Sequence, residues 1–318
     1  MPAQCEGRLV EENFFRRFGF RRPPAAGRWL GAAVLASIVW AGCSPAIRTV
    51  VPFEERPLPA LTESREELLV RIAGLEGGIR SLTGTSARYT ARGLGMTTGV
   101  LAEYRETEGA MLVERPDNIR MRGSAPLGFG TVFDMVSDSQ MFQVWLPTRN
   151  QFITGETRSV TCSPNAILNL RPQHIMDALF VDVSRYADNP DVVSVLEVVP
   201  EGRRSFYVLF FIDRSREPAQ LLEKIWVDRL DLTIVRKQLF GMEGVLQTDA
   251  AYTEWEETDG QFFPRRIVVE RPAEDYSLEI RFDDLRLNDP PVEDAFVLPV
   301  PPGAEVIVVE TDPEECRN

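Results

Sequence analysis

The chain has 318 residues, of which 44% are hydrophobic, and its 48 acidic and 35 basic residues give a formal net charge of −13. Such a surface repels nucleic-acid phosphates, and the sequence has no basic stripe interleaved with aromatic residues to offset this. Nucleic acid is therefore excluded as the expected partner. No apolar run approaches the length of about 20 residues that a membrane-spanning helix needs.

The first 42 residues have the layout of an export signal. An arginine-rich stretch from Arg16 to Arg28 precedes a 14-residue apolar run, Trp29 to Gly42. A basic region, a short apolar region and small residues at a cleavage point are typical of a secretory signal. The small residues are Ala41 and Gly42, so we expect residues 1–42 to be removed.

The end of this signal resembles the bacterial lipobox, in which a lipid is attached to a cysteine and cleavage occurs just before it. The residues are Val39-Trp40-Ala41-Gly42-Cys43, and Trp40 stands where the pattern usually has leucine. An ordinary cleaved signal with a chance cysteine, or a retained N-terminal anchor, are the alternatives. We expect a covalent lipid on Cys43 and no other cofactor. Each buried CH2 contributes about 0.8 kcal/mol, so several acyl chains on one cysteine would anchor the chain firmly.

Residues 43–62 are predicted to form an extended tether. Pro45, Pro52, Pro57 and Pro59 fall in this stretch, and proline is incompatible with a regular helix or a central strand. The two cysteines that follow, Cys162 and Cys316, lie far apart in sequence. In an oxidising periplasm they could pair, or they could remain two free thiols, and their spacing does not decide between these.

One amphipathic helix should open the folded domain. Ser64 and Glu67 form a capping-box pattern, and apolar residues recur at helical spacing from Leu68 to Leu82. Gly74, Gly77 and Gly78 weaken this helix, so it needs a larger surface to pack against.

Short strand patterns follow, separated by turn-forming residues such as Glu108-Gly109, Pro116-Asp117-Asn118 and Asp259-Gly260. Hairpin spacing of this kind predicts an antiparallel meander. A short helix from Arg171-Pro172 to Phe180 divides two groups of strands, and the role of the region from about 155 to 204 stays open. The predicted strands cover 86–94, 100–106, 110–115, 118–123, 131–137 and 141–146, then 205–213, 223–228, 233–240, 248–256, 265–270, 276–283 and 305–310.

The expected fold is mainly β with helices (α+β). Residues 63–310 would form an antiparallel incomplete barrel, with an N-terminal helix and a helical insertion covering its concave face, because a sheet of about ten strands curls. An acidic tail, 311–318, would follow.

Five segments in this order resemble the LolA/LolB superfamily, the periplasmic carrier and outer-membrane receptor for lipoproteins. They are Pro116 to Arg122, Ala125 to Gly128, Phe133 to Val136, Gln143 to Pro147 and Phe296 to Gly303. With a lipid-modified N-terminus, the chain is more similar to the LolB-like receptors. The resemblance implies an N-terminal helix on an incomplete barrel, and a location in the cell envelope, anchored at the periplasmic face of the outer membrane. Ser44, directly after the cysteine, is compatible with that location.

The resemblance also implies a protruding loop in which Leu127 contacts a membrane or a lipidated cargo. Phe129 lies beside it among Gly123, Gly128 and Gly130, and such a loop can present two apolar side chains. The alternative is that Leu127 packs beneath the barrel.

The main functional hypothesis is a membrane-anchored protein that binds lipid or lipidated protein in a hydrophobic half-barrel cavity. Its partners would be the membrane, acyl chains or lipoproteins, and a periplasmic carrier. The competing hypothesis is an envelope interaction module with a filled β core. The residues expected to line the cavity are Phe133, Trp145, Phe210, Trp226 and Ile280.

We find no pattern typical of an enzyme. His174 is the only histidine, on a predicted helix with Asp177 three residues on, and a structural role is the favoured interpretation over a hydrolytic dyad. No cluster of His, Cys and carboxylate residues has metal-ligand spacing. Catalytic and metal sites are therefore predicted to be absent.

Overall fold

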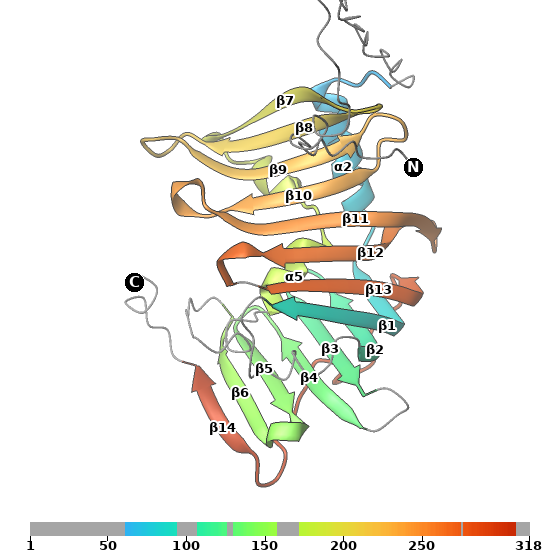
Figure 1. Ribbon diagram of the computed structural model, residues 1–318, viewed down its shortest axis with the longest axis vertical. Coiled ribbons are helices and arrows are strands. Elements are labelled where there is room, and N and C mark those ends of the chain that lie inside the picture. Colours follow the sequence, from blue (N-terminus) through green and yellow to red (C-terminus); the bar gives the residue numbers. More distant parts are fainter. Residues whose placement is uncertain (1–60, 94–106, 126–129, 158–171, 275, 310–318) are drawn as a thin grey trace, which may run out of the picture. The chain divides into compact units, whose positions relative to one another are not determined.

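The fold is built on one sheet of fourteen strands. The computed structural model describes residues 61–93, 107–125, 130–157, 172–274 and 276–309, which all belong to one unit that begins at Glu55 (Figure 1). Its described α-helices are α2 (Arg65–Gly77) and α5 (Pro172–Leu179). Four short 3-10 turns also occur, η2 (Pro147–Arg149), η3 (Ser184–Tyr186), η4 (Met242–Gly244) and η5 (Pro272–Glu274).

The first antiparallel meander contains six strands: β1 (Ser81–Gly93), β2 (Thr107–Glu114), β3 (Asn118–Ser124), β4 (Thr131–Ser137), β5 (Met141–Leu146) and β6 (Gln151–Glu156). The second contains seven: β7 (Val192–Glu201), β8 (Arg204–Asp213), β9 (Gln220–Asp228), β10 (Ile234–Phe240), β11 (Leu246–Thr258), β12 (Gln261–Arg271) and β13 (Tyr276–Leu287). The first strand of one meander, β1, pairs antiparallel with the last strand of the other, β13. Finally β14 (Glu305–Val309) adds to β6 in parallel, so β14 and β7 are the two edges and the sheet is open.

The predicted fold class is confirmed: the chain is mainly β, almost entirely antiparallel, and consistent with an incomplete barrel. Two local predictions were wrong. The helix expected to continue to Leu82 ends at Gly77, and Ser81 already begins β1. Glu108-Gly109 was expected to turn, but both residues lie inside β2. Strands β6 and β7 were not predicted at all. The predicted segment 100–106 lies outside the described residues.

One face of the sheet, called here the inner face, carries the main core. In β13, Tyr276, Leu278, Ile280 and Phe282 are buried, and the alternate residues point to the other face, as the period of a strand requires. Helix α2 packs on the inner face through Leu68 and Ile72, which are both almost completely buried. Its capping box forms as predicted, with Ser64 N donating to Glu67 Oε2 (2.7 Å) and Glu67 N donating to Ser64 Oγ (3.2 Å).

The opposite, outer face differs along the sheet. Over β3–β6 a C-terminal strap, residues 288–304, covers it and forms a second apolar cluster. Arg120 Nη1 fixes the strap by donating to Ala295 O (2.8 Å). The cluster contains Val136, Phe152 and Leu298, with Trp145, Phe296 and Ala304 packed against it.

Around β11–β13 and β1, the outer face is charged and its ion pairs cross from strand to strand. These are Arg88–Asp283 (2.8 Å), Arg266–Glu279 (2.7 Å) and Arg281–Glu254 (3.2 Å).

The free edge of β7 is short because both of its ends are blocked. Arg214 N donates to Asp191 O (2.9 Å), and in an antiparallel pair every second residue is hydrogen-bonded to the neighbouring strand. Ser194, Leu196 and Val198 lie between those residues, so they turn their backbone N–H and C=O groups away from β8. The carbonyl of Ser194 already accepts a hydrogen bond from Arg65 Nη1 (2.9 Å). Pro200, the next outward residue, has no N–H. Only Leu196 and Val198 therefore present both groups to the edge.

Candidate functional site

The inner face is apolar in both meanders, and its side chains form one continuous cluster with the two helices. The pairing registers align the inward residues from strand to strand, for example Tyr89 beside Ile280 and Ile280 beside Ile267. Both helices lie behind the strands in Figure 1, on this face. Other buried inward residues are Met111, Met121, Met135, Val144, Ile153, Leu209, Ile225, Val227, Tyr252 and Val269.

Helix α5 lies between distant parts of this face. It contacts β11 and β12 on one side and β4 on the other, although β4 and β11 are six places apart in the sheet. The sheet therefore curves around α5, as predicted for the helical insertion. The buried apolar residues of α5 and the segment after it are Pro172, Ile175, Met176, Ala178, Leu179, Phe180, Val181 and Val183.

Side chains from the sheet satisfy the carbonyl groups at the C-terminal end of α5. Lys237 of β10, which is 1% exposed, donates from Nζ to Asp177 O (2.7 Å) and Phe180 O (2.8 Å). Tyr252 of β11 donates its hydroxyl to Ala178 O (2.7 Å). The last carbonyls of a helix have no partner within the helix, and a cation there also interacts favourably with its dipole. These contacts tie α5 to the inner face.

A buried carboxylate balances the charge of Lys237. Glu223 of β9, which is 0% exposed, lies 3.6 Å from Lys237 Nζ through Oε1. Its other oxygen, Oε2, accepts hydrogen bonds from the Arg185 guanidinium and from the Tyr186 hydroxyl (2.8 Å). Glu223 thus joins η3 to the strands.

The electrostatics of this cluster follow from Glu223. Burial is the largest single influence on the pKa of the Arg185 guanidinium and would lower it, but the charge of Glu223, its hydrogen bond to Arg185, and the nearby Tyr186 and Asp177 together outweigh burial and raise that pKa. Burial and then Glu223 raise the pKa of Tyr186, whose ring stacks on Phe211 (centroids 4.6 Å apart). Arg185 therefore stays charged and Tyr186 stays protonated at neutral pH.

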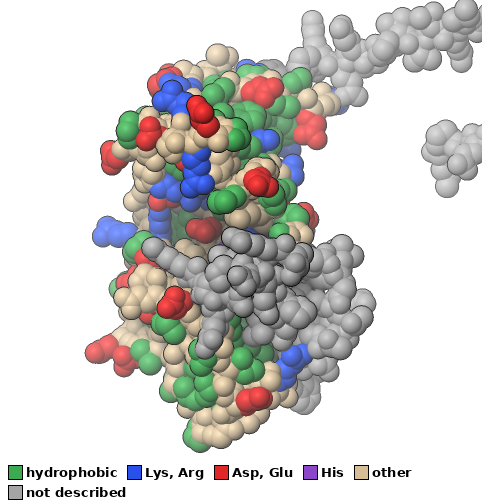
Figure 2. Space-filling view, turned by 90° about the vertical axis from the view of Figure 1, so that its left-hand side faces the viewer, with side chains coloured by type: hydrophobic (Ala, Val, Ile, Leu, Met, Phe, Trp, Pro, Cys, Tyr) green, Lys and Arg blue, Asp and Glu red, His purple; other side chains and the backbone are tan. Residues whose placement is uncertain are grey.

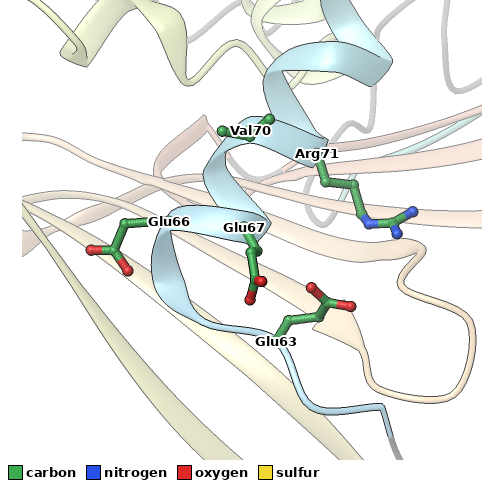
Figure 3. A pocket seen from close by; sticks show the side chains of 5 residues that line it. All are labelled: Glu63, Glu66, Glu67, Val70 and Arg71. Carbon is green, nitrogen blue, oxygen red and sulfur yellow. The ribbon is translucent and has the colours of Figure 1, made fainter.

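A separate hollow lies on the exposed side of α2. Its volume is about 580 Å³, and Glu63, Glu66, Glu67, Val70 and Arg71 line it (Figure 3). Hydrogen bonding to Arg65 lowers the pKa of Glu66, and hydrogen bonding to the Ser64 backbone lowers that of Glu67. Glu66 is therefore already paired with Arg65, and Glu67 is engaged in capping the start of α2. Because only Val70 is apolar, this hollow is not suited to an acyl chain.

The five residues predicted to line a cavity do not share one face. Phe133 and Ile280 lie on the inner face, where Phe133 packs over Gly123 and against the ring of Tyr89 (centroids 5.9 Å apart). The other three lie on the outer face, because each pairs with an outward residue of its neighbouring strand. Trp145 packs in the cluster beneath the strap, while Phe210 and Trp226 contact the cations Lys224 and Arg236. These three cannot line an inner-face cavity.

Cys43, Leu127, Phe129, Cys162 and Cys316 lie outside the described residues. The expectations about the lipid anchor, the protruding loop and the disulfide therefore remain predictions.

Glu223, Lys237 and Tyr252 were not predicted as site residues. The position of Glu223 carries a usable signal, because Glu223 has the same strand parity as the apolar Ile225 and Val227 and so points inward with them. A charge at an inward position is uncommon unless it is paired.

His174 lies in α5, with Nε2 3.5 Å from Arg271 Nη2. Among the residues that the structure describes, no three His, Cys, Asp or Glu side chains are placed to hold a metal ion. Nor does any helix in those residues have the length and apolar character to cross a membrane.

Comparisons with known proteins returned matches only among solved structures: no protein-family model and no curated protein matches the chain. A DUF1329 family protein from Desulfovibrio piger is 15% identical, over 72% of this chain and 93% of that one, with a TM-score of 0.47. An outer membrane lipoprotein-sorting protein domain from Vibrio parahaemolyticus is 11% identical, over 72% and 94%, with a TM-score of 0.47. A LolA superfamily protein from Nitrosomonas europaea is 14% identical, over 74% and 99%, with a TM-score of 0.44.

Proposed function

We propose that this chain is a lipid-anchored protein of the bacterial envelope that binds an acyl chain, free or on a lipoprotein, between the inner face of its sheet and α5. The observation that carries the proposal is the position of α5. This eight-residue helix, rather than a second sheet, covers the apolar inner face between strands that are distant in the sheet. A lipid can replace so small a cover without disrupting the strand pairing.

The free energies on the two sides of this exchange are comparable. Burying a large apolar side chain contributes about 1.5–3 kcal/mol, so releasing Ile175, Met176, Leu179 and Phe180 would cost roughly 6–12 kcal/mol. An acyl chain of about 14 methylenes would gain roughly 11 kcal/mol at about 0.8 kcal/mol each. The hydrogen bonds from Lys237 and Tyr252 to the end of α5 then decide how readily the exchange occurs.

The anchor part of the proposal rests on the sequence, from the arginine-rich signal to Cys43 and the proline-containing tether. Mass spectrometry of the mature N-terminus tests it. A diacylated or triacylated Cys43 is expected, and an unmodified cysteine or a retained signal would exclude the anchor.

Acyl binding is tested by titrating the full chain with a dansyl-labelled fatty acid and following its fluorescence. Lys237→Met removes two hydrogen bonds that hold α5, so we expect it to tighten probe binding about tenfold, equivalent to about 1.4 kcal/mol. Lys224→Met is the matched control, because Lys224 lies on the outer face between Phe210 and Phe240 and should leave binding unchanged. Absence of saturable binding in all three chains would exclude this site.

A second candidate function is an envelope interaction module with a filled β core. The observation that favours it is the continuous packing of α5 and both meanders into one apolar cluster. In that case the dansyl probe would not bind, and Lys237→Met would only lower the stability of the fold.

A further inference from the structure

Two hairpins at one end of the second meander form an exposed apolar tip. The turn between β10 and β11 exposes Met242 by 69% and Val245 by 53%. The turn is closed by a hydrogen bond from Gly241 N to Val245 O (2.8 Å), and Gln220 Nε2 of β9 donates to Gly241 O (2.9 Å). The backbone is thus fixed, and it holds both apolar side chains outward.

Two cations lie beside this tip and rest on apolar groups, although Glu243 also lies in the turn and Asp213 pairs with Arg216 (3.8 Å). Arg216, in the neighbouring turn between β8 and β9, has Nη1 3.8 Å from Met242 Sδ. Lys224 Nζ lies 5.2 Å from the ring centroids of both Phe210 and Phe240. Long basic side chains that cover apolar surface while their charge stays in water are typical of proteins at a membrane interface. Figure 2 faces this end of the sheet and shows hydrophobic side chains intermixed with charged ones in its upper half.

The local charge also differs from that of the whole chain. The stretches at this end, residues 213–224 and 240–247, contain three basic residues (Arg214, Arg216 and Lys224) and, apart from the buried Glu223, three acidic ones (Asp213, Glu217 and Glu243), whereas the whole chain has a net charge of −13. This end therefore lacks the acidic excess that would repel anionic lipid head groups. The outer-face ion pairs around β12, β13 and β1 offer no comparable apolar surface.

We infer that the tip formed by Met242, Val245, Arg216 and Lys224 contacts the surface of a bilayer that contains anionic lipid. The inference rests on the proposed anchor, because a lipid on Cys43 keeps the tip at a high effective concentration near the membrane. Two side chains then suffice to orient the domain, although they would not recruit an untethered protein. The contact would turn this end of the second meander toward the lipid.

The test uses the full lipidated chain on phosphatidylethanolamine–phosphatidylglycerol vesicles, with and without brominated acyl chains, which quench nearby tryptophan. The reporter is Met242→Trp. The control is Val292→Trp, which is equally exposed (Val292 is 78% exposed) but follows the opposite end of β13. We expect brominated lipid to quench the added fluorescence of Met242→Trp, relative to the unsubstituted chain, and to leave that of Val292→Trp unchanged.

Equal quenching of the two variants, or quenching of neither on vesicles that retain the protein, overturns the inference and leaves the anchor intact. Loss of retention itself refutes the anchor and the tethered contact together. As a second measurement, vesicles should slow amide hydrogen exchange in residues 241–245 of the unsubstituted chain. Unchanged exchange there also contradicts the inference.

Discussion

The two meanders share an inward pattern of apolar residues but differ in what covers their outer face. In β3–β6, residues such as Val136 and Phe152 point outward and are nevertheless buried, because the strap of residues 288–304 crosses them. In β7–β13 the outward positions carry ion pairs or aromatic rings with cations. The second meander in turn places charges inside, at Glu223 and Lys237. Burial therefore depends on which distant segment crosses a strand, as well as on the strand itself.

The largest expected loss of stability comes from removing an inward-facing charge of the second meander. Glu223→Ala would leave Lys237 and Arg185 without their carboxylate, and breaking a buried pair costs about 3–5 kcal/mol. Glu279→Ala, on the outer face opposite Arg266, should cost at most about 1 kcal/mol because that pair is partly exposed. Denaturant unfolding of both variants measures the difference. Equal losses of unfolding free energy would mean that the inner and outer charges contribute equally to stability.

The next effect concerns the outer face of the first meander. Leu298→Ala removes a side chain of the strap that is 8% exposed, and we expect a loss of about 2–3 kcal/mol in unfolding free energy. Val297→Ala, one residue earlier and 58% exposed, is the control and should change stability by less than about 0.5 kcal/mol. If the control is as costly as Leu298→Ala, the strap does not form a second core.

The smallest effect is a pH dependence in the segment after α5. Burial would raise the pKa of Asp182, but hydrogen bonds from Ser184 and the charge of Arg115 outweigh burial and lower it below 3.8. Because the folded pKa is depressed, the stabilisation is present above the unfolded pKa and is lost as pH falls through the folded value.

Asp182→Asn should therefore be less stable than the parent chain at about pH 6, and the gap should close below about pH 3.8. Unfolding curves at several pH values measure it. A gap that is the same at acid and neutral pH would show that the charge of Asp182 contributes nothing.

Local signals explain which parts of the fold could be predicted. The start of α2 follows from Ser64 and Glu67, and the turn at Asp259-Gly260 follows from two residues that tolerate positive φ, here 51° and 76°. The orientation of β13 follows from its strict alternation. Each of these depends on neighbours in the chain.

Other features of the fold depend on contacts between residues far apart in the sequence, or lie in strands whose apolar residues do not alternate with polar ones. Residues Phe206 to Ile212 in β8 are apolar at every position, so the sequence cannot indicate that Phe210 points outward and Leu209 inward. The same holds for the valine-rich β7, which was missed. Trp145 is buried by the strap, whose path no local pattern reveals. The hydrogen bonds that hold the end of α5 join residues 57 or more positions apart in the sequence, and only the folded sheet brings those residues together.

The blocked edge at β7 has a consequence for the solubility of the chain. A long, valine-rich edge strand is a template on which further copies can polymerise. Pro200 limits that growth permanently, but the hydrogen bond from Arg65 to Ser194 O exists only while α2 is docked. Resistance to aggregation is thereby coupled to the attachment of α2, which lies more than 100 residues before β7 in the sequence. Any event that releases α2, such as heating or incomplete folding, opens the strand for self-assembly.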